Sequence, residues 1–205
     1  MPDHPDECEK NVLEPGCSRC PALVESRTCI SWGNGPVDAD VVVVGEAPGA
    51  GDPDAETWKG GNHTGFAYTS RHSGRRVRSL FESLGYADRT YYTNAVNCFP
   101  EGDDGSNREP TREERRSCRT HLETELGQVS PDLVVTTGKH ATATLLAFDG
   151  EILGGFLDRV LEPFDSRTLE VRVLPLLHPS YQEVWLSRLG YTPERYREAI
   201  AAHLP

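Results

Sequence analysis

The segment Asp40–Gly49, with the sequence DVVVVGEAPG, decides the fold of this chain. Its four consecutive valines predict a strand buried on both faces, as in parallel sheets that helices cover. The strand runs directly into a turn that holds two glycines, a proline and the carboxylate of Glu46. Because ligands of open α/β sheets bind beyond the carboxyl ends of the strands, we expect the functional site at this turn.

Strand and helix patterns alternate after this segment, which predicts an α/β fold with one mostly parallel sheet of about four strands between helices. The length of 205 residues suits one sizeable core, so we expect a single domain over 1–205, of which 1–36 shows no periodicity. The expected strands are 40–45, 90–96, 132–138 and 171–177, the expected helices are 72–85, 111–129, 141–148 and 192–204, and a β excursion is expected within 151–173.

The composition is strongly acidic, with 32 Asp and Glu against 21 Lys and Arg, a net charge of −11, and only three lysines. Such a surface suits a salt-rich cytoplasm and predicts a halophilic source, although an ordinary acidic protein has a similar composition. The charge argues only weakly against a nucleic-acid partner, because four arginines cluster within 71–78, where a solvated helix face is the alternative interpretation.

No stretch approaches the ~20 apolar residues of a membrane span, and the start MPDHPDE has no signal-peptide profile. We therefore expect a soluble, cytoplasmic protein with no membrane partner.

The six cysteines give the first chemical signal. Cys17 and Cys20 form a C-x-x-C pair, a spacing that lets two thiolates bind one metal centre. Cys98 and Cys118 are the candidates for the other two ligands, although Cys8 or Cys29 could replace one of the four. Spacing does not choose between zinc and an iron–sulfur cluster, and burial as a small apolar residue is the plain alternative for any one cysteine.

The turn after the valine strand lacks both the G-K-[ST] of a phosphate loop and the G-x-G-x-x-G of dinucleotide sites, which disfavours a nucleotide cofactor. Three residues at strand exits could face the same crevice. Asn94 could read a base edge, His178 could donate to a developing anion, and Asp52 could position a water. Each has a plainer interpretation, as a turn former, a satisfied histidine and a loop cap.

Together these motifs resemble family 4 of the uracil-DNA glycosylases. The matching segments run from the amino-terminal part to the last strand: CSRCPALVESR at 17–27, GEAPG at 45–49, TNAVNC at 93–98, NREPTREE at 107–114 and HPSY at 178–181. The resemblance implies a three-layer α/β/α sandwich, uracil-containing DNA as the partner, and hydrolysis of the uracil N-glycosidic bond to leave an abasic site. It also implies a [4Fe–4S] cluster on Cys17, Cys20, Cys98 and Cys118.

The resemblance further implies roles for individual residues. Glu46 and Asp52 match the two acidic catalytic positions, the second of which is commonly glutamate in the family, and His178 matches the catalytic histidine. The positions implied to bind the substrate are Gly45, Ala47, Pro48, Gly49, Phe66, Asn94, Asn107 and Ser180.

The chain departs from the family pattern in the loop HTGFAYTSRHSG, which is longer and lacks a proline. Within it we expect Phe66 to stack on the base, with Tyr68 as second choice. Ala47 argues against membership of the related branch that attaches covalently to DNA. Two other hypotheses remain: an inactive cluster-bearing DNA-binding protein and a four-cysteine zinc interaction module. We expect a monomer; binding to a polymerase clamp stays open.

Overall fold

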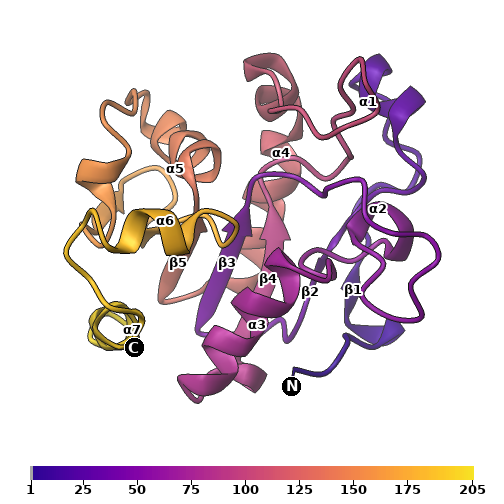
Figure 1. Ribbon diagram of the computed structural model, residues 1–205. Coiled ribbons are helices and arrows are strands. Elements are labelled where there is room, and N and C mark those ends of the chain that lie inside the picture. Colours follow the sequence, from indigo (N-terminus) through magenta and orange to yellow (C-terminus); the bar gives the residue numbers. More distant parts are fainter. Residues whose placement is uncertain (1) are drawn as a thin grey trace.

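The computed structural model of the chain describes residues 2–205 and contains one seven-stranded sheet with the order β1-β2-β4-β3-β5-β7-β6 (Figure 1). The four central strands β4, β3, β5 and β7 pair in parallel, whereas the edge strands pair antiparallel. The strands are β1 Lys10–Asn11, β2 Gly33–Asn34, β3 Val41–Gly45, β4 Thr90–Asn94, β5 Leu133–Thr137, β6 Phe164–Ser166 and β7 Val171–Leu176.

This arrangement confirms the predicted α/β sandwich with a mostly parallel sheet, but the prediction of about four strands was too low. The four predicted strands are the parallel ones, which are long enough to show an apolar run. The additional strands β1 and β2 have two residues each, and β6 has three. Strands β1 and β2 are too short to carry a readable periodicity, whereas β6 lies within the β excursion expected at 151–173.

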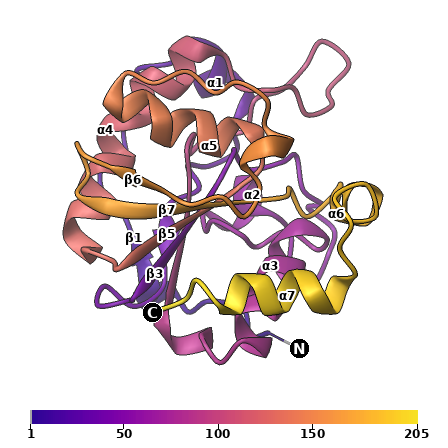
Figure 2. The same cartoon turned by 90° about the vertical axis from the view of Figure 1, so that its left-hand side faces the viewer.

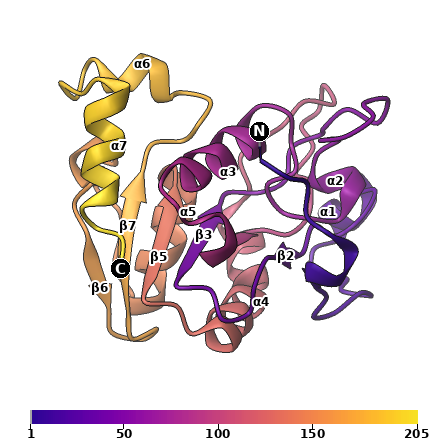
Figure 3. The ribbon, with the colours of Figure 1, turned by 90° about the horizontal axis from the view of Figure 1, so that it is seen from below.

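Helices cover both faces of the sheet, with α4 and α5 on one face and α3 and α7 on the other (Figure 2). In Figure 3, seen from below, α3 and α7 lie toward the top of the view and α4 toward the bottom. The helices are α1 Pro21–Ser26, α2 Gly61–Thr64, α3 Ser73–Ser83, α4 Arg112–Val129, α5 Lys139–Leu146, α6 Gln182–Leu186 and α7 Pro193–Ala201. The 3-10 turns are η1 Glu7–Glu9, η2 Ala87–Arg89, η3 Ala147–Asp149 and η4 Leu157–Arg159.

The valine strand β3 joins the two cores. Val41 and Val43 pack into the core under α3 and α7, while Val42 and Val44 pack into the core under α4 and α5. All four side chains are fully buried. Burying one valine side chain contributes about 1.5–3 kcal/mol to the stability of the fold. The four valines of β3 therefore help to hold the helices on both faces of the sheet.

Helix α4 begins as its sequence predicts. The Thr111 hydroxyl accepts the Glu114 N–H at 3.1 Å, and Glu114 Oε2 accepts the Thr111 N–H at 2.7 Å. This capping box satisfies amide groups that would otherwise lack partners in the first turn. It fixes the start of the helix that carries Cys118. Within residues 2–205, none of the helices combines the length and apolar character that crossing a membrane requires.

Helix α4 also buries a carboxyl group against the amino-terminal strands. Glu125 is fully buried and accepts hydrogen bonds from the Gly33 N–H at 3.0 Å, the Tyr91 hydroxyl at 3.2 Å and the Thr93 hydroxyl. Burial raises the pKa of Glu125 to about 7. This group ties β2, the short strand that enlarges the sheet, to β4 and α4.

The raised pKa predicts a pH-dependent stability. Because the folded state holds the Glu125 proton more tightly than the unfolded chain does, the free energy of unfolding falls as the pH rises from about 4.5 to about 7. The change due to this group is on the order of 3 kcal/mol. Urea unfolding across this pH range should show a smaller decline in Glu125→Gln than in the wild type. Parallel curves for the two proteins would contradict the assignment.

Candidate functional site

A small cavity of about 50 Å³ lies at the carboxyl ends of the four parallel strands. Its walls include Gly45 from β3, Asn94 from β4, Thr137 from β5 and His178 just after β7. A groove of about 560 Å³ adjoins it and shares Glu46, Ala47, Pro48 and His178 with it. The structure therefore places the candidate site at the turn after the valine strand, as expected from the sheet topology.

The wall formed by β3 and β4 depends on the absence of a side chain at Gly45. Gly45 pairs with Asn94 in the parallel register, and a Cβ on Gly45 would lie 2.5 Å from Asn94 Oδ1 and 2.9 Å from the Tyr68 hydroxyl. Asn94 is 5% exposed and lines the cavity, and no hydrogen bond within residues 2–205 involves its side-chain amide. Since this amide is not among the fully buried side-chain groups that lack a partner, it is open to the cavity and available to a ligand.

Tyr68 and not Phe66 lines this cavity. The Tyr68 hydroxyl lies 2.7 Å from Thr137 Oγ1, its ring packs on Tyr92, and its backbone has a left-handed φ of 56°. Phe66 is 2% exposed and lies on the other side of the loop, under the Lys10 ammonium at 4.0 Å. The structure thus favours our second choice for the stacking residue. The left-handed backbone at Tyr68 directs its side chain into the cavity, and the residue types of the loop do not predict this conformation.

Glu46 is half-buried at the boundary between the cavity and the groove. Burial raises its pKa and the nearby Glu109 adds to this, while His140, Arg115 and Lys139 lower it. His140 Nε2 lies 3.0 Å from Glu109 Oε2. His140 and Glu109 were not predicted from the sequence, although His140 lies just after the carboxyl end of β5, where site residues are expected.

His178 is held as a neutral hydrogen-bond donor. Its Nδ1 accepts the Ser180 N–H at 3.2 Å, which leaves the proton on Nε2, and burial lowers its pKa. Gly138 gives the ring its space, because a Cβ there would lie 3.2 Å from His178 Cβ. The arrangement presents an uncharged N–H donor to the site.

Three other predicted site residues lie outside the small cavity. Asn107 is exposed and stabilises the turn after β3, because its Oδ1 accepts the Ala50 N–H at 3.0 Å. Ser180 is exposed and lines the groove. Asp52 is exposed, accepts the Asp54 N–H at 3.1 Å and lines neither space. Its catalytic role stays a prediction.

The arginines of 71–78 do not form one surface patch. Arg78 donates through its Nε to the Tyr68 carbonyl at 3.0 Å, lies over the Tyr92 ring and also contacts Asn34. Arg76 donates to the Pro179 carbonyl at 3.1 Å and so supports the loop after β7. These arginines serve the shape of the site, and Arg71 is exposed.

The four predicted ligand cysteines meet in a separate apolar cluster with Leu23, Ile30, Trp32 and Val96. Their thiols form no disulfide. Burial raises the pKa of the Cys118 thiol to about 12 and also raises the pKa of the Cys98 thiol. By contrast, Cys8 is exposed, and the Cys29 thiol donates to the Asn62 carbonyl at 3.0 Å. Thiols gathered in this way suit a thiolate-binding metal centre.

The turn connects the cysteine cluster to the cavity. Ala47 packs against the cluster, while the Val96 N–H donates to the Glu46 carbonyl at 3.0 Å. The Ala95 N–H donates to the Gly45 carbonyl at 2.8 Å. Both amide groups belong to the segment that continues into Cys98, so the cluster and the cavity share one wall.

Comparison with known proteins gives a consistent family. A family model described as the uracil DNA glycosylase superfamily matches residues 32–204. The type-4 uracil-DNA glycosylase of Thermotoga maritima is 31% identical over 166 residues, 80% of this chain and 77% of the relative. The type-4 enzyme of Archaeoglobus fulgidus is 29% identical, covering 85% and 81%. That of Sulfurisphaera tokodaii is 28% identical, covering 80% and 70%.

The environment of His178 predicts its protonation state. Because burial lowers the pKa, the ring should be neutral at about pH 7 with its proton on Nε2. Long-range ¹⁵N–¹H correlation spectra report the tautomer directly, and His203, which lies at the end of α7, serves as the reference ring. A spectrum of a doubly protonated ring, or of a proton on Nδ1, would contradict this assignment.

Proposed function

The chain belongs to the type-4 branch of the uracil-DNA glycosylase superfamily, and from this premise we propose that it hydrolyses the N-glycosidic bond of uracil in DNA to leave an abasic site. The observation that carries the proposal is the unpartnered amide of Asn94 at the wall of the small cavity, between Gly45 and Tyr68. A side-chain amide offers N–H donors on its nitrogen and a carbonyl acceptor, which can match O4 and N3–H of uracil.

Access to the cavity requires the nucleotide to leave the helical stack. Rotating a base out of a duplex costs a few kcal/mol, and least for a mismatched base such as uracil opposite guanine. The cavity lies at the carboxyl ends of the parallel strands, and Tyr68 would offer an aromatic face to the extruded base. Stacking and the Asn94 amide together offset the cost of extrusion.

Cleavage of the glycosidic bond leaves negative charge on the uracil and positive charge on the sugar. His178 would donate its Nε2–H to a uracil oxygen and stabilise the negative charge. A neutral imidazole can do this without losing its proton. The backbone N–H groups of the turn would contribute in the same way.

Glu46 would act on the sugar side, where a carboxylate stabilises positive charge and orients the attacking water. Its ionised form is needed for both tasks. Burial works against ionisation, and His140, Arg115 and Lys139 favour it. The pairing of Glu109 with His140 keeps this histidine next to the groove.

We further propose that Cys17, Cys20, Cys98 and Cys118 hold a [4Fe–4S] cluster. The four clustered thiols fit this group, and the Asn97 side-chain Nδ2 is buried without a partner within residues 2–205, directly before Cys98. When bound, the cluster would supply metal–sulfur bonds that cross-link the amino-terminal segment, the loop after β4, and α4. The shared turn makes this cross-link a support for the cavity.

The cofactor proposal predicts a brown protein with a broad absorbance band at roughly 400 nm after anaerobic purification. Cys118→Ser should lose this band and unfold at a lower temperature, whereas Cys8→Ser should match the wild type because Cys8 is exposed. A colourless wild type that contains zinc would instead support the zinc interaction module.

The activity is tested with a labelled oligonucleotide that contains one uracil. We expect an abasic product from the wild type, a loss of roughly 10²- to 10³-fold in single-turnover rate for His178→Ala, and a loss of about tenfold or more for Asn94→Ala and Glu46→Gln. Because the halophilic source stays a prediction from composition, the assay is run at low and at molar salt.

Tyr68→Leu and Phe66→Leu provide a matched pair for the same assay. Loss of stacking at Tyr68 should slow excision by about tenfold. Folded Phe66→Leu should excise at nearly the wild-type rate, since this ring lies outside the cavity. DNA binding by the wild type without any product would support the inactive homologue and overturn the proposed function.

A further inference from the structure

Two arginines flank the cysteine cluster, and neither belongs to the proposed reaction. Arg27 follows α1 and is half-buried. Its Nη1 donates to Cys98 Sγ at 3.2 Å, and its Nη2 donates to the Cys17 carbonyl at 2.7 Å. One guanidinium group thus connects two of the three segments that carry the four cysteines. The planar fork of arginine permits both contacts at once, which a lysine ammonium on a flexible stem does not reproduce.

Arg19 lies within the C-x-x-C pair, and its guanidinium group is held by two neighbours. Its Nη2 donates to Glu14 Oε2 at 2.6 Å, and its Nη1 lies 2.8 Å from His121 Nε2. The same Nη1 is 3.8 Å from Cys17 Sγ. Glu14 and His121 therefore orient Arg19 toward the sulfur. The Arg19 side chain is 41% exposed, so its effect is screened more than that of Arg27.

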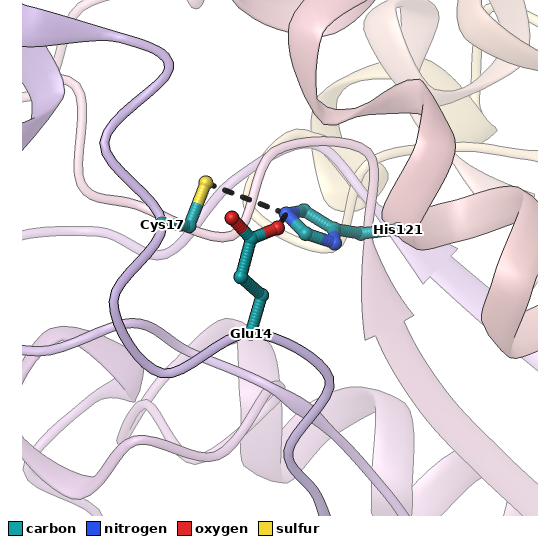
Figure 4. A group of neighbouring side chains, drawn as sticks. All are labelled: Glu14, Cys17 and His121. Atoms are coloured by element: carbon teal, nitrogen blue, oxygen red, sulfur yellow. Dashed lines mark hydrogen bonds and ion pairs between the residues drawn. The ribbon is translucent and has the colours of Figure 1, made fainter.

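Figure 4 shows Glu14 and His121 converging on Cys17, a grouping that by itself resembles a cation site. The guanidinium of Arg19 excludes that interpretation, because its positive charge already contacts both the carboxylate and the ring. Since arginine can only donate, His121 Nε2 must accept, and the ring carries its proton on Nδ1. Burial and Arg19 both lower the pKa of His121, which is consistent with a neutral ring.

The charges at the cluster explain why cations are needed there. Four thiolates around a cluster leave net negative charge, and Cys17, Cys98 and Cys118 are buried. Glu114, which is paired with Arg108, also lies near Cys20. A buried charge without compensation is expensive. The two guanidinium groups supply positive charge at Cys98 and Cys17, on the side of the amino-terminal segment.

We propose that Arg27 and Arg19 are positioning residues that retain the cluster and raise its reduction potential, with Arg27 the stronger of the two. The inference rests on the cofactor proposed above. Hydrogen bonds and positive charge at the sulfurs stabilise the more negative reduced cluster and therefore favour uptake of an electron. Loss of a neighbouring donor also weakens metal binding, by about 10- to 100-fold in comparable sites.

The test uses DNA-free holoprotein, so its outcome does not depend on uracil excision. Iron release to a chelator is followed by the decay of the absorbance band, and the reduction potential is measured by anaerobic titration with dithionite. The variants are Arg27→Gln, Arg27→Lys and Glu14→Gln. Glu14→Gln removes the carboxylate that holds Arg19, and it does so without altering a residue that touches the sulfurs. The matched control is Arg89→Gln, because Arg89 forms an ion pair with Asp40 and lies over the Tyr86 ring, away from the cysteines.

We expect Arg27→Gln to release iron at least about tenfold faster than the wild type and to have a more negative potential. Arg27→Lys keeps the positive charge. Its reduction potential should therefore stay close to that of the wild type, while it releases iron faster. Glu14→Gln should show a small effect of the same sign, and Arg89→Gln none. The lysine variant distinguishes an effect of charge from an effect on folding. If Arg27 had a purely structural role, the reduction potential would not depend on whether the charge at this position is kept.

The proposal is overturned if folded Arg27→Gln and Arg27→Lys match the wild type in both measurements, or if Arg89→Gln behaves like Arg27→Gln. If Arg27→Gln does not fold, the reduction potential of Arg27→Lys and the rate of iron release from Glu14→Gln decide whether the proposal holds. A wild type that holds zinc and no iron overturns this inference and the cofactor proposal together. Absence of uracil excision by a brown, iron-loaded protein overturns only the proposed function.

Discussion

The parallel pairing of β3 with β4 and β5 is the constraint on which the site depends. β3 is buried on both faces, and its valines pair in register with β4 from Val41 to Val44. The same register places Gly45 beside Asn94. The absence of a side chain at Gly45 then leaves space for the Asn94 amide and the Tyr68 hydroxyl, which both lie close to Gly45. Core packing thus sets the geometry of a polar site.

The turn after β3 has two neighbours with different requirements. On one side it forms the cavity wall, and on the other side Ala47 packs against the cysteine cluster. Two backbone hydrogen bonds connect the turn to the segment that leads to Cys98. A centre bound by the cysteines would therefore stabilise the catalytic turn without contacting the substrate. Through the same coupling, the proposed action of Arg27 and Arg19 on a bound cluster would also affect the cavity, although the proposed chemistry needs no electron.

The sequence predicts the parts of this protein that follow from regular patterns. The four parallel strands, the capping box at Thr111 and the α/β class follow from apolar runs and local hydrogen bonding. The positions of Asn94 and His178 follow from the rule that strand exits converge. The two-residue strands could not be predicted, because they exist only through pairing with distant segments. The sequence does not show which of Phe66 and Tyr68 faces the cavity, because this depends on the left-handed backbone at Tyr68.

Burial acts on both proposed catalytic groups, and the difference between them comes from their neighbours. It lowers the pKa of His178 and raises the pKa of Glu46, so in each case it favours the neutral form. For His178, burial lowers the pKa, which suits a neutral donor. For Glu46, His140, Arg115 and Lys139 lower the pKa and so favour the carboxylate, against burial and Glu109, which raise it. One desolvated site can therefore hold an uncharged donor on the base side and a negative charge on the sugar side, as bond cleavage with separation of charge requires.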